Sequence, residues 1–309
     1  MFLVNKVDCK DKKKFPNQKT FDQLFLKLLT FLYGFEYFCR KCATFASMIF
    51  YFSGTGNTKW VAGEIAQALH DDLVSIPDAI RTKQYAYTLQ AGEQIGFCFP
   101  THGWQPPRIV REFIRHLIFS RLSADTYCWA LTTCGDNMGE AMTILNKELK
   151  QKGLEAETQF SVIMPESYVC LPFMYTDSEI REAEKIENAR RQLSHITRIL
   201  KDRKRGIIEL EKGATPRLYS YVIGGYFNKK MITDRKFNVD TSVCISCGAC
   251  ANVCPVDDIR LSAVNGKQSP QWLHNERCTS CLACYHHCPV HAINFGKITR
   301  KRGQYYFKG

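Results

Sequence analysis

The pattern of apolar and polar positions between residues 48 and 204 alternates between two kinds of segment. Short apolar runs bounded by polar or turn residues are typical of buried strands. Longer segments with apolar positions on one face, such as Val61, Ile65 and Leu69, are typical of amphipathic helices. The pattern predicts strands over residues 49–52, 72–76, 94–99, 127–131 and 160–164, and helices over residues 58–70, 107–119, 139–152 and 177–204. Strands that alternate with helices predict an α/β fold with a doubly wound, parallel, five-stranded sheet.

A glycine-rich loop follows the first predicted strand and opens the first predicted helix. In open α/β sheets, ligands bind at the carboxyl ends of the strands, and a helix N-terminus favours a phosphate group. The loop lacks the Gly-Lys-Ser/Thr sequence of nucleoside triphosphate sites and the G-x-G-x-x-G pattern of dinucleotide sites. A loop without lysine fits a monophosphate such as that of FMN. The expected phosphate-binding residues are Ser53, Gly54, Thr55, Gly56, Asn57 and Thr58.

This loop resembles the FMN phosphate loop of flavodoxins, and the resemblance extends from residue 48 to about residue 165. It implies that the loops after the third and fourth predicted strands hold the flavin ring, with Trp104 stacked on it. A flavodoxin-like scaffold that has lost its flavin is the alternative. The residues expected in these two loops are Pro100, Thr101, His102, Gly103, Trp104, Thr133, Cys134, Gly135, Asn137 and Gly139.

Two cysteine runs near the C-terminus carry the strongest chemical signal of the chain. Each run has the spacing C-x2-C-x2-C-x3-C-P, and the second begins 34 residues after the first. This spacing is the bacterial iron–sulfur signature, in which the fourth cysteine of each run ligates the other cluster. Two zinc sites are the alternative, but zinc usually takes cysteines as separated pairs. The spacing predicts one [4Fe–4S] cluster on Cys244, Cys247, Cys250 and Cys288, and a second on Cys278, Cys281, Cys284 and Cys254.

Residues 237–297 closely resemble a two-cluster bacterial ferredoxin domain, and the chain from Met48 resembles the flavodoxin–ferredoxin fusion proteins of anaerobic microbes. The resemblance implies a small α+β ferredoxin-like domain behind the flavodoxin-like one. The expected organisation is a basic extension over residues 1–47, a flavodoxin-like domain over 48–205, a linker or docking segment over 206–236 and the ferredoxin-like domain over 237–309. Met48 is the expected biological start, since a strand-like run follows it at once.

The other cysteines and the charge limit the remaining functional classes. The seven cysteines outside the runs are scattered and odd in number, which argues against a disulfide framework and for a reducing, cytoplasmic compartment. The formal net charge is +12, but the basic runs lack the aromatic interleaving of a nucleic-acid module, so no nucleic-acid partner is expected. The apolar stretch 24–38 is too short and interrupted for a transmembrane segment. The oligomeric state stays open.

These features predict an electron-transfer iron–sulfur flavoprotein that passes electrons between two [4Fe–4S] clusters and FMN. A low-potential electron carrier or reductase is the expected partner protein. Electron transfer needs no general acid or base, so the sequence names no catalytic residue. Two alternatives remain: a flavin-dependent reductase of a small organic substrate, and a flavin-free iron–sulfur redox sensor or carrier. A roomy pocket around His102, Trp104 and Cys134 would favour the reductase.

Overall fold

The computed structural model describes residues 47–308 apart from residues 91, 124 and 265. The expectations for the basic extension therefore lie outside the described residues, apart from Ser47. Within the described part, no helix is long and apolar enough to cross a membrane.

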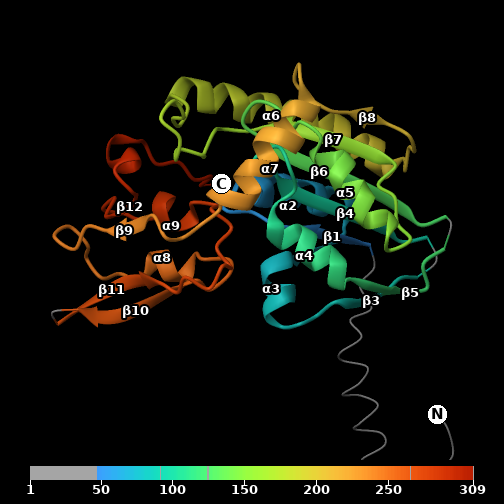
Figure 1. The fold of residues 1–309 in the computed structure, drawn as a ribbon. Helices are drawn as coiled ribbons and strands as arrows, with labels where there is room; N and C mark the ends of the chain where they lie inside the picture. Colours follow the sequence, from blue (N-terminus) through green and yellow to red (C-terminus); the bar gives the residue numbers. More distant parts are fainter. Residues whose placement is uncertain (1–46, 91, 124, 265, 309) are drawn as a thin grey trace, which may run out of the picture. The chain divides into compact units, whose positions relative to one another are not determined.

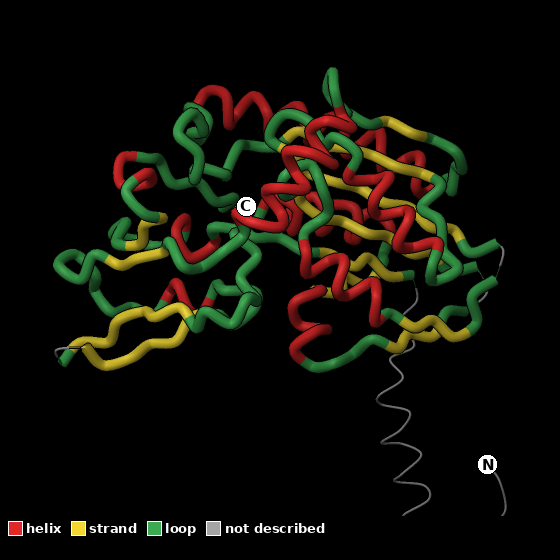
Figure 2. Tube along the Cα trace, in the orientation of Figure 1, coloured by secondary structure: helices red, strands yellow, loops and turns green. Residues whose placement is uncertain are grey.

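A parallel sheet of six strands forms the centre of the N-terminal lobe, and its strands lie side by side in Figure 2. The strand order is β2-β1-β4-β6-β7-β8, and every neighbouring pair is parallel. This is the order of a flavodoxin-like doubly wound sheet with one extra edge strand. The strands are β1 (Met48–Tyr51), β2 (Asp72–Ser75), β4 (Gln94–Pro100), β6 (Tyr127–Cys134), β7 (Thr158–Ile163) and β8 (Ile208–Glu209).

The sixth strand corrects the expected count of five. It has only two residues, Ile208–Glu209, and pairs with Gln159 and Phe160 of β7. A two-residue strand carries too little periodicity to stand out in a sequence. The sheet therefore extends beyond residue 205, where the expected linker begins.

Helices cover both faces of this sheet (Figure 1). One face packs on α2 (Asn57–Leu69) and α6 (Glu179–Lys201), through buried residues such as Val61, Ile65 and Leu193. The other face packs on α3 (Ile76–Arg81), α4 (Arg108–His116) and α5 (Ala141–Lys150), around Phe50 and Phe113. Apolar side chains on both faces explain why the central strands read as nearly continuous apolar runs.

The cysteine-rich lobe is small and built from short elements. It holds the antiparallel pairs β9 (Phe237–Val239) with β12 (Ile293–Phe295) and β10 (Ile259–Val264) with β11 (Lys267–Trp272), and the helices α8 (Ala249–Asn252) and α9 (Ala283–His286). Its apolar cluster includes Val169 and Cys170 from the loop after β7. Val256 in turn joins the core of the first lobe, and Arg81 pairs with Asp257 at 3.0 Å. The lobes therefore share parts of their cores.

Three further parts of the described chain were not expected as regular structure. The strands β3 (Ala86–Thr88) and β5 (Ile118–Ser120) form a separate parallel pair, and β5 follows α4 directly. A helical segment over residues 218–231 contains π-helical turns around α7 (Gly224–Tyr226). A short 3₁₀-helix, Ile298–Lys301, precedes the C-terminal residues. The predicted strands and helices of the first lobe otherwise appear where expected, with ends that differ by a few residues.

Candidate cofactor sites

The predicted phosphate loop lies between β1 and α2, at the carboxyl end of β1. Gly56 has a φ of +94°, which favours glycine, and its N–H donates to Ser53 Oγ at 3.1 Å. Among the described residues, nothing accepts a hydrogen bond from the N–H groups of Asn57, Thr58 and Lys59 at the start of α2. These free donors and the helix dipole suit an anion.

The polar side chains of this loop mostly bind other parts of the chain. The Thr58 and Thr133 hydroxyls lie 2.7 Å apart, which ties the loop to the end of β6. Asn57 Nδ2 donates to the Pro165 carbonyl at 3.1 Å, and Asn57 Oδ1 accepts from the Tyr305 hydroxyl at 2.6 Å. We infer that these side chains hold the loop in shape, while the backbone N–H groups remain for a phosphate.

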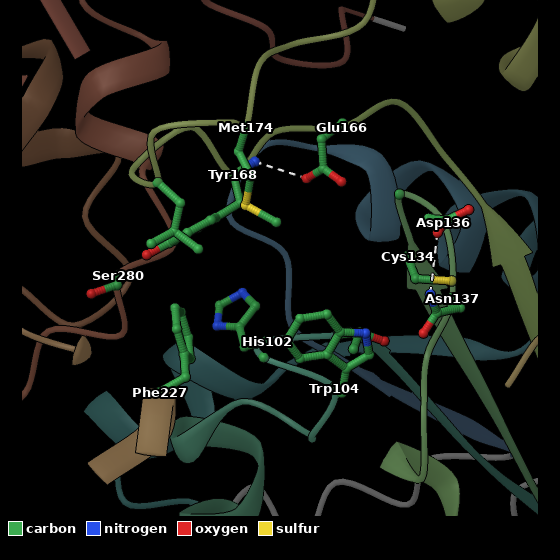
Figure 3. A pocket seen from close by; sticks show the side chains of 14 residues that line it. His102, Trp104, Cys134, Asp136, Asn137, Glu166, Tyr168, Met174, Phe227 and Ser280 are labelled. Atoms are coloured by element: carbon green, nitrogen blue, oxygen red, sulfur yellow. Dashed lines mark hydrogen bonds between the residues drawn. The ribbon is translucent and has the colours of Figure 1, made fainter. Parts of the chain in front are cut away.

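A cavity of about 190 Å³ lies at the carboxyl ends of β4, β6 and β7. Figure 3 shows its labelled side chains around the open space. Seven predicted flavin-site residues line it: Thr101, His102, Gly103, Trp104, Cys134, Gly135 and Asn137. The other predicted residues do not: Ser53, Gly54, Thr55, Gly56, Asn57, Thr58, Pro100, Thr133 and Gly139. The phosphate loop and the cavity are therefore neighbouring sites, joined through the Thr58–Thr133 contact.

The sequence did not predict seven of the residues that line the cavity. They are Asp136, Glu166, Tyr168, Leu171, Met174, Phe227 and Ser280. Four of them come from the loop after β7, which is rich in aromatic and apolar residues for a surface loop. That composition was the available signal, because a loop at the carboxyl end of a parallel strand lies at the ligand-binding edge.

Trp104 presents only one free face to the cavity. Its other face stacks on Tyr219 of the helical segment 218–231, with ring centroids 4.9 Å apart. Ser220 Oγ donates to the Trp104 carbonyl at 2.9 Å and accepts from the Glu140 N–H at 2.7 Å. Trp104 itself has a φ of +56°, an unusual value for a tryptophan. The helical segment thus fixes the ring that the sequence predicts to stack on a flavin.

Two uncharged side chains, His102 and Cys134, line the same cavity. Burial lowers the pKa of His102 to about 4, although a hydrogen bond with the Thr279 backbone opposes the shift. Its ring also meets Phe52 edge to face, with centroids 6.0 Å apart. Burial, followed by the nearby Glu166 charge, raises the pKa of Cys134 well above its usual value. At neutral pH the imidazole and the thiol are therefore both neutral.

The eight cysteines of the two runs gather in two groups of four around two separate small cavities. Cys244, Cys247, Cys250 and Cys288 line one cavity, and Cys254, Cys278, Cys281 and Cys284 line the other. We call them the first and second thiol sites. These are the two sets expected from the spacing. Among the described residues, no group of three or more His, Cys, Asp or Glu side chains is arranged to hold a single metal ion.

The backbone around the thiol sites repeats with the sequence. Ser246, Gly248 and Asp257 have positive φ values, and so do their counterparts 34 positions later, Ser280, Leu282 and His291. The Cys254 sulfur accepts from the N–H four residues on, and the Cys288 sulfur does the same, each at 3.2 Å. Such N–H···S bonds stabilise thiolates and tune the potential of a bound cluster.

Burial disfavours free thiolates at these sites. It raises the pKa of Cys250 to about 11 and raises the pKa of Cys284 well above its usual value. Four thiols gathered around one cavity ionise together only when a cationic centre compensates them, since metal binding releases their protons. The donor set, the repeated loops and the N–H···S bonds together fit an iron–sulfur cluster at each site.

The second thiol site touches both flavin-site regions. A Cβ atom built on Gly54 would lie 2.7 Å from Cys281 Cβ, so only glycine allows this approach. Ser280 lines the cavity, and Thr279 contacts His102 through its backbone. The loop of the second thiol site therefore forms part of the wall around the predicted FMN site.

The first thiol site is more open to solvent than the second. Cys247 is exposed, whereas Cys281 is partly buried and Cys284 is buried. Ile245 and Val243 beside it are 59% and 45% exposed, so apolar side chains lie at the surface next to this thiol site.

The C-terminal residues 304–308, which we call the strap, cross the phosphate loop. The Phe307 N–H donates to the Thr55 carbonyl at 2.8 Å, and the Phe307 ring stacks on Trp60 at 4.8 Å. Gln304 Nε2 donates to the Cys288 carbonyl at 2.9 Å. Together with the Tyr305–Asn57 hydrogen bond, these contacts join the phosphate loop to the cysteine-rich lobe.

Comparison with known proteins agrees with this geometry. A family model described as a flavodoxin domain matches residues 48–168, and a model described as a 4Fe-4S dicluster domain matches residues 243–292. No curated protein matches the chain.

Similar solved structures cover about half of the chain. They include the Trp repressor binding protein from Bacillus subtilis, with 12% identity over 50% of this chain and 97% of that chain and a TM-score of 0.32. A flavodoxin from the domain Archaea has 16% identity over 50% of this chain and 99% of that chain, with a TM-score of 0.30. An FMN-dependent NADH-azoreductase from Bacillus anthracis str. Ames Ancestor, in complex with FMN, has 8% identity over 50% of this chain and 99% of that chain, with a TM-score of 0.31.

The two family matches support iron–sulfur clusters and FMN as cofactors of the chain, and the thiol sites and the phosphate loop fit these groups. They also place the two domains in the order expected from the sequence. The chain thus has an N-terminal flavodoxin domain followed by a C-terminal 4Fe-4S dicluster domain.

Proposed function

We propose that this chain is an internal electron conduit between two [4Fe–4S] clusters and FMN. The first and second thiol sites would each hold a cluster, and the phosphate loop with the cavity would hold FMN. When bound, clusters exchange single electrons, whereas a flavin exchanges one or two. The contact of Gly54 with Cys281 carries this proposal, since it brings the second thiol site against the phosphate loop.

The proposed order follows from how each thiol site is enclosed. The second site borders the phosphate loop and the cavity, so we assign it to exchange with FMN. The first site has the exposed Cys247 and the exposed Val243 and Ile245 around it. We therefore assign it to exchange with an external redox protein, whose docking would cover these aliphatic side chains.

The cavity also favours a second candidate, a flavin-dependent reductase of a small organic substrate. Its lining combines the neutral His102 and Cys134 with the aromatic Trp104 and Tyr168. At about 190 Å³ it is smaller than the ~300–1,000 Å³ typical of ligand pockets. A ring bound there would leave little space for a substrate, which is why the conduit ranks first.

The test begins with protein purified without oxygen, in which iron, sulfide and flavin are counted per chain. The conduit requires about eight irons, as two cubanes need, and about one FMN. The variants Cys247→Ser and Cys278→Ser then each remove one site. With a reduced small ferredoxin as donor, Cys278→Ser should abolish FMN reduction, and Cys247→Ser should slow it. Zinc in place of iron, or clusters without flavin, would overturn the proposal. Steady turnover of an organic acceptor would favour the reductase.

A further inference from the structure

Glu166 is a carboxylic acid at the edge of the cavity that the electron conduit does not require. It follows β7, where Pro165 accepts from Asn57 and the Glu166 N–H donates to Asp177 Oδ2 at 2.8 Å. Its partly buried side chain lines the cavity. Figure 3 shows it across the open space from His102 and Trp104, the ring predicted to stack on a flavin.

The two carboxyl oxygens of Glu166 have different surroundings. Oε1 accepts from the Tyr168 and Ser167 N–H groups at 2.9 and 3.0 Å, which fixes the orientation of the side chain. No hydrogen bond within the described part of the chain engages Oε2. A Cβ built on Gly135 would lie 2.0 Å from Oε2, so glycine makes room for this atom. One oxygen is thus anchored and the other is available to a ligand.

None of the described residues is a direct counterion of Glu166. Lys185 of α6 approaches, but its Nζ binds Asp177 Oδ2 at 2.6 Å and the Gly135 carbonyl at 2.9 Å. Asp177 adds a like charge, and the adjacent Cys134 is neutral. Burial is the largest cause of a raised Glu166 pKa, and the two backbone hydrogen bonds and Lys185 oppose it only in part. The Glu166 carboxyl group therefore stays protonated up to a higher pH than that of an ordinary glutamate.

We propose that Glu166 is the proton-exchanging residue of the cavity, giving a proton to the bound ring as that ring gains electrons and taking it back on oxidation. This inference rests on the proposed function, which supplies the electrons from the thiol-bound clusters. In this step the O–H bond at Glu166 breaks, an N–H bond forms on the ring, and one electron enters the ring from the clusters. The carboxylate stays ionised until the ring is oxidised, and the same proton then returns to it.

A carboxyl group outside the cavity is the matched control. Glu184 of α6 is exposed to solvent and does not line the cavity. A proton on Glu184 exchanges directly with water, so its removal should not alter proton delivery inside the cavity. Glu184→Gln and Glu166→Gln make the same chemical change outside and inside the site.

The experiment compares FMN-loaded, cluster-loaded protein with these two variants between pH 5.5 and 8.5. FMN affinity is measured first, by flavin fluorescence, and then the rate of FMN reduction by dithionite in H₂O and D₂O. In Glu166→Gln the reduction should slow at least about a hundredfold, the low end of general acid effects, and lose its solvent isotope effect. Glu184→Gln should match the wild type.

Infrared difference spectra of the wild type provide a second measurement if Glu166→Gln fails to fold. Reduction minus oxidation should show the loss and recovery of one protonated carboxyl band that shifts in D₂O. Bound FMN with an unchanged rate and isotope effect in Glu166→Gln, or no such band in the wild type, would overturn the role of Glu166 alone. Failure of the wild type to bind FMN would instead overturn the proposed function, and the inference with it.

Discussion

The missing side chain at position 54 makes the contact between the phosphate loop and the second thiol site possible. A Cβ there would lie 2.7 Å from Cys281 Cβ and 3.0 Å from the Cys281 carbonyl oxygen. Gly54→Ala should therefore push two loops apart and destabilise the protein by about 1–3 kcal/mol, as overpacking does. Thermal unfolding without oxygen measures this as a lower midpoint.

Gly63 is the matched control for this substitution. It lies in α2, and a Cβ built there meets nothing within 4 Å. Gly63→Ala should stabilise the helix by about 0.5–1 kcal/mol, because alanine loses less backbone entropy on folding. Equal midpoints for Gly54→Ala and Gly63→Ala would contradict the close packing at Cys281.

His102 should make the protein less stable in weak acid. Its pKa is about 4 in the fold, against an ordinary 6.5, because burial disfavours the charged ring. Above pH 6.5 the ring is neutral in both states, and the free energy of unfolding is not reduced. As pH falls toward 4, the unfolded chain binds the proton first, and the folded protein loses stability. Because the ring is partly exposed, we expect a loss of about 1–2 kcal/mol between pH 7.5 and 5.

The comparison with His102→Asn isolates this effect. Asp71, whose pKa burial raises to about 6, acts in the opposite direction, because its neutral form is favoured in the fold. Both proteins share Asp71, so the difference between their unfolding midpoints reports His102 alone. A difference that stays constant from pH 7.5 to 5 would show that the ring titrates normally in the fold.

At the scale of elements, the strap positions the phosphate loop through one short hydrogen bond. The Tyr305 hydroxyl donates to Asn57 Oδ1 at 2.6 Å, and Asn57 precedes two of the free N–H groups. Tyr305→Phe should destabilise the ordered conformation of the phosphate loop by about 1 kcal/mol, the usual net contribution of a hydrogen bond. FMN affinity, measured by fluorescence with clusters intact, should fall about fivefold.

Tyr306→Phe is the control from the same strap. Tyr306 is 36% exposed, and its ring stacks on His287 with centroids 4.4 Å apart. Loss of its hydroxyl leaves that stacking and the phosphate loop unchanged. If the two variants bind FMN equally well, the strap does not position Asn57.

The elements that could be predicted from the sequence are those whose pattern is local. Strands such as β6 are apolar throughout, and the loop at Gly54 and Gly56 has a recognisable composition. Ser178 caps α6, since its side chain accepts from the Arg181 N–H, and serine is a preferred residue at this position.

The missed parts depend on contacts between distant segments. Residues 219–227 form an apolar stretch whose sequence predicts no definite structure, because Tyr219 gains its role only by stacking on Trp104. The loop after β7 holds no motif, yet Glu166 faces the cavity. The strap meets the phosphate loop across a sequence separation of 248 residues. No local periodicity reports such contacts.

For the whole molecule, the contacts of the second thiol site predict that FMN binding and cluster retention are coupled. Cys281 packs on Gly54, and Ser280 lines the cavity. A cluster orders this loop, because metal binding and local folding are linked. A ligand that binds more tightly to the ordered loop must then stabilise the bound cluster. The cluster in turn strengthens ligand binding by the same factor.

Chelation tests this coupling directly. A chelator should remove iron in two phases of about four irons each, as two cubanes require. FMN should slow only the phase of the second site, by about fivefold or more, the low end of typical coupling. The first site, with its exposed Cys247, should lose iron at an unchanged rate. In Cys247→Ser only the FMN-sensitive phase should remain. If FMN slows both phases equally, it stabilises the protein as a whole. If FMN slows neither phase, the loop of the second site is ordered independently of the flavin site.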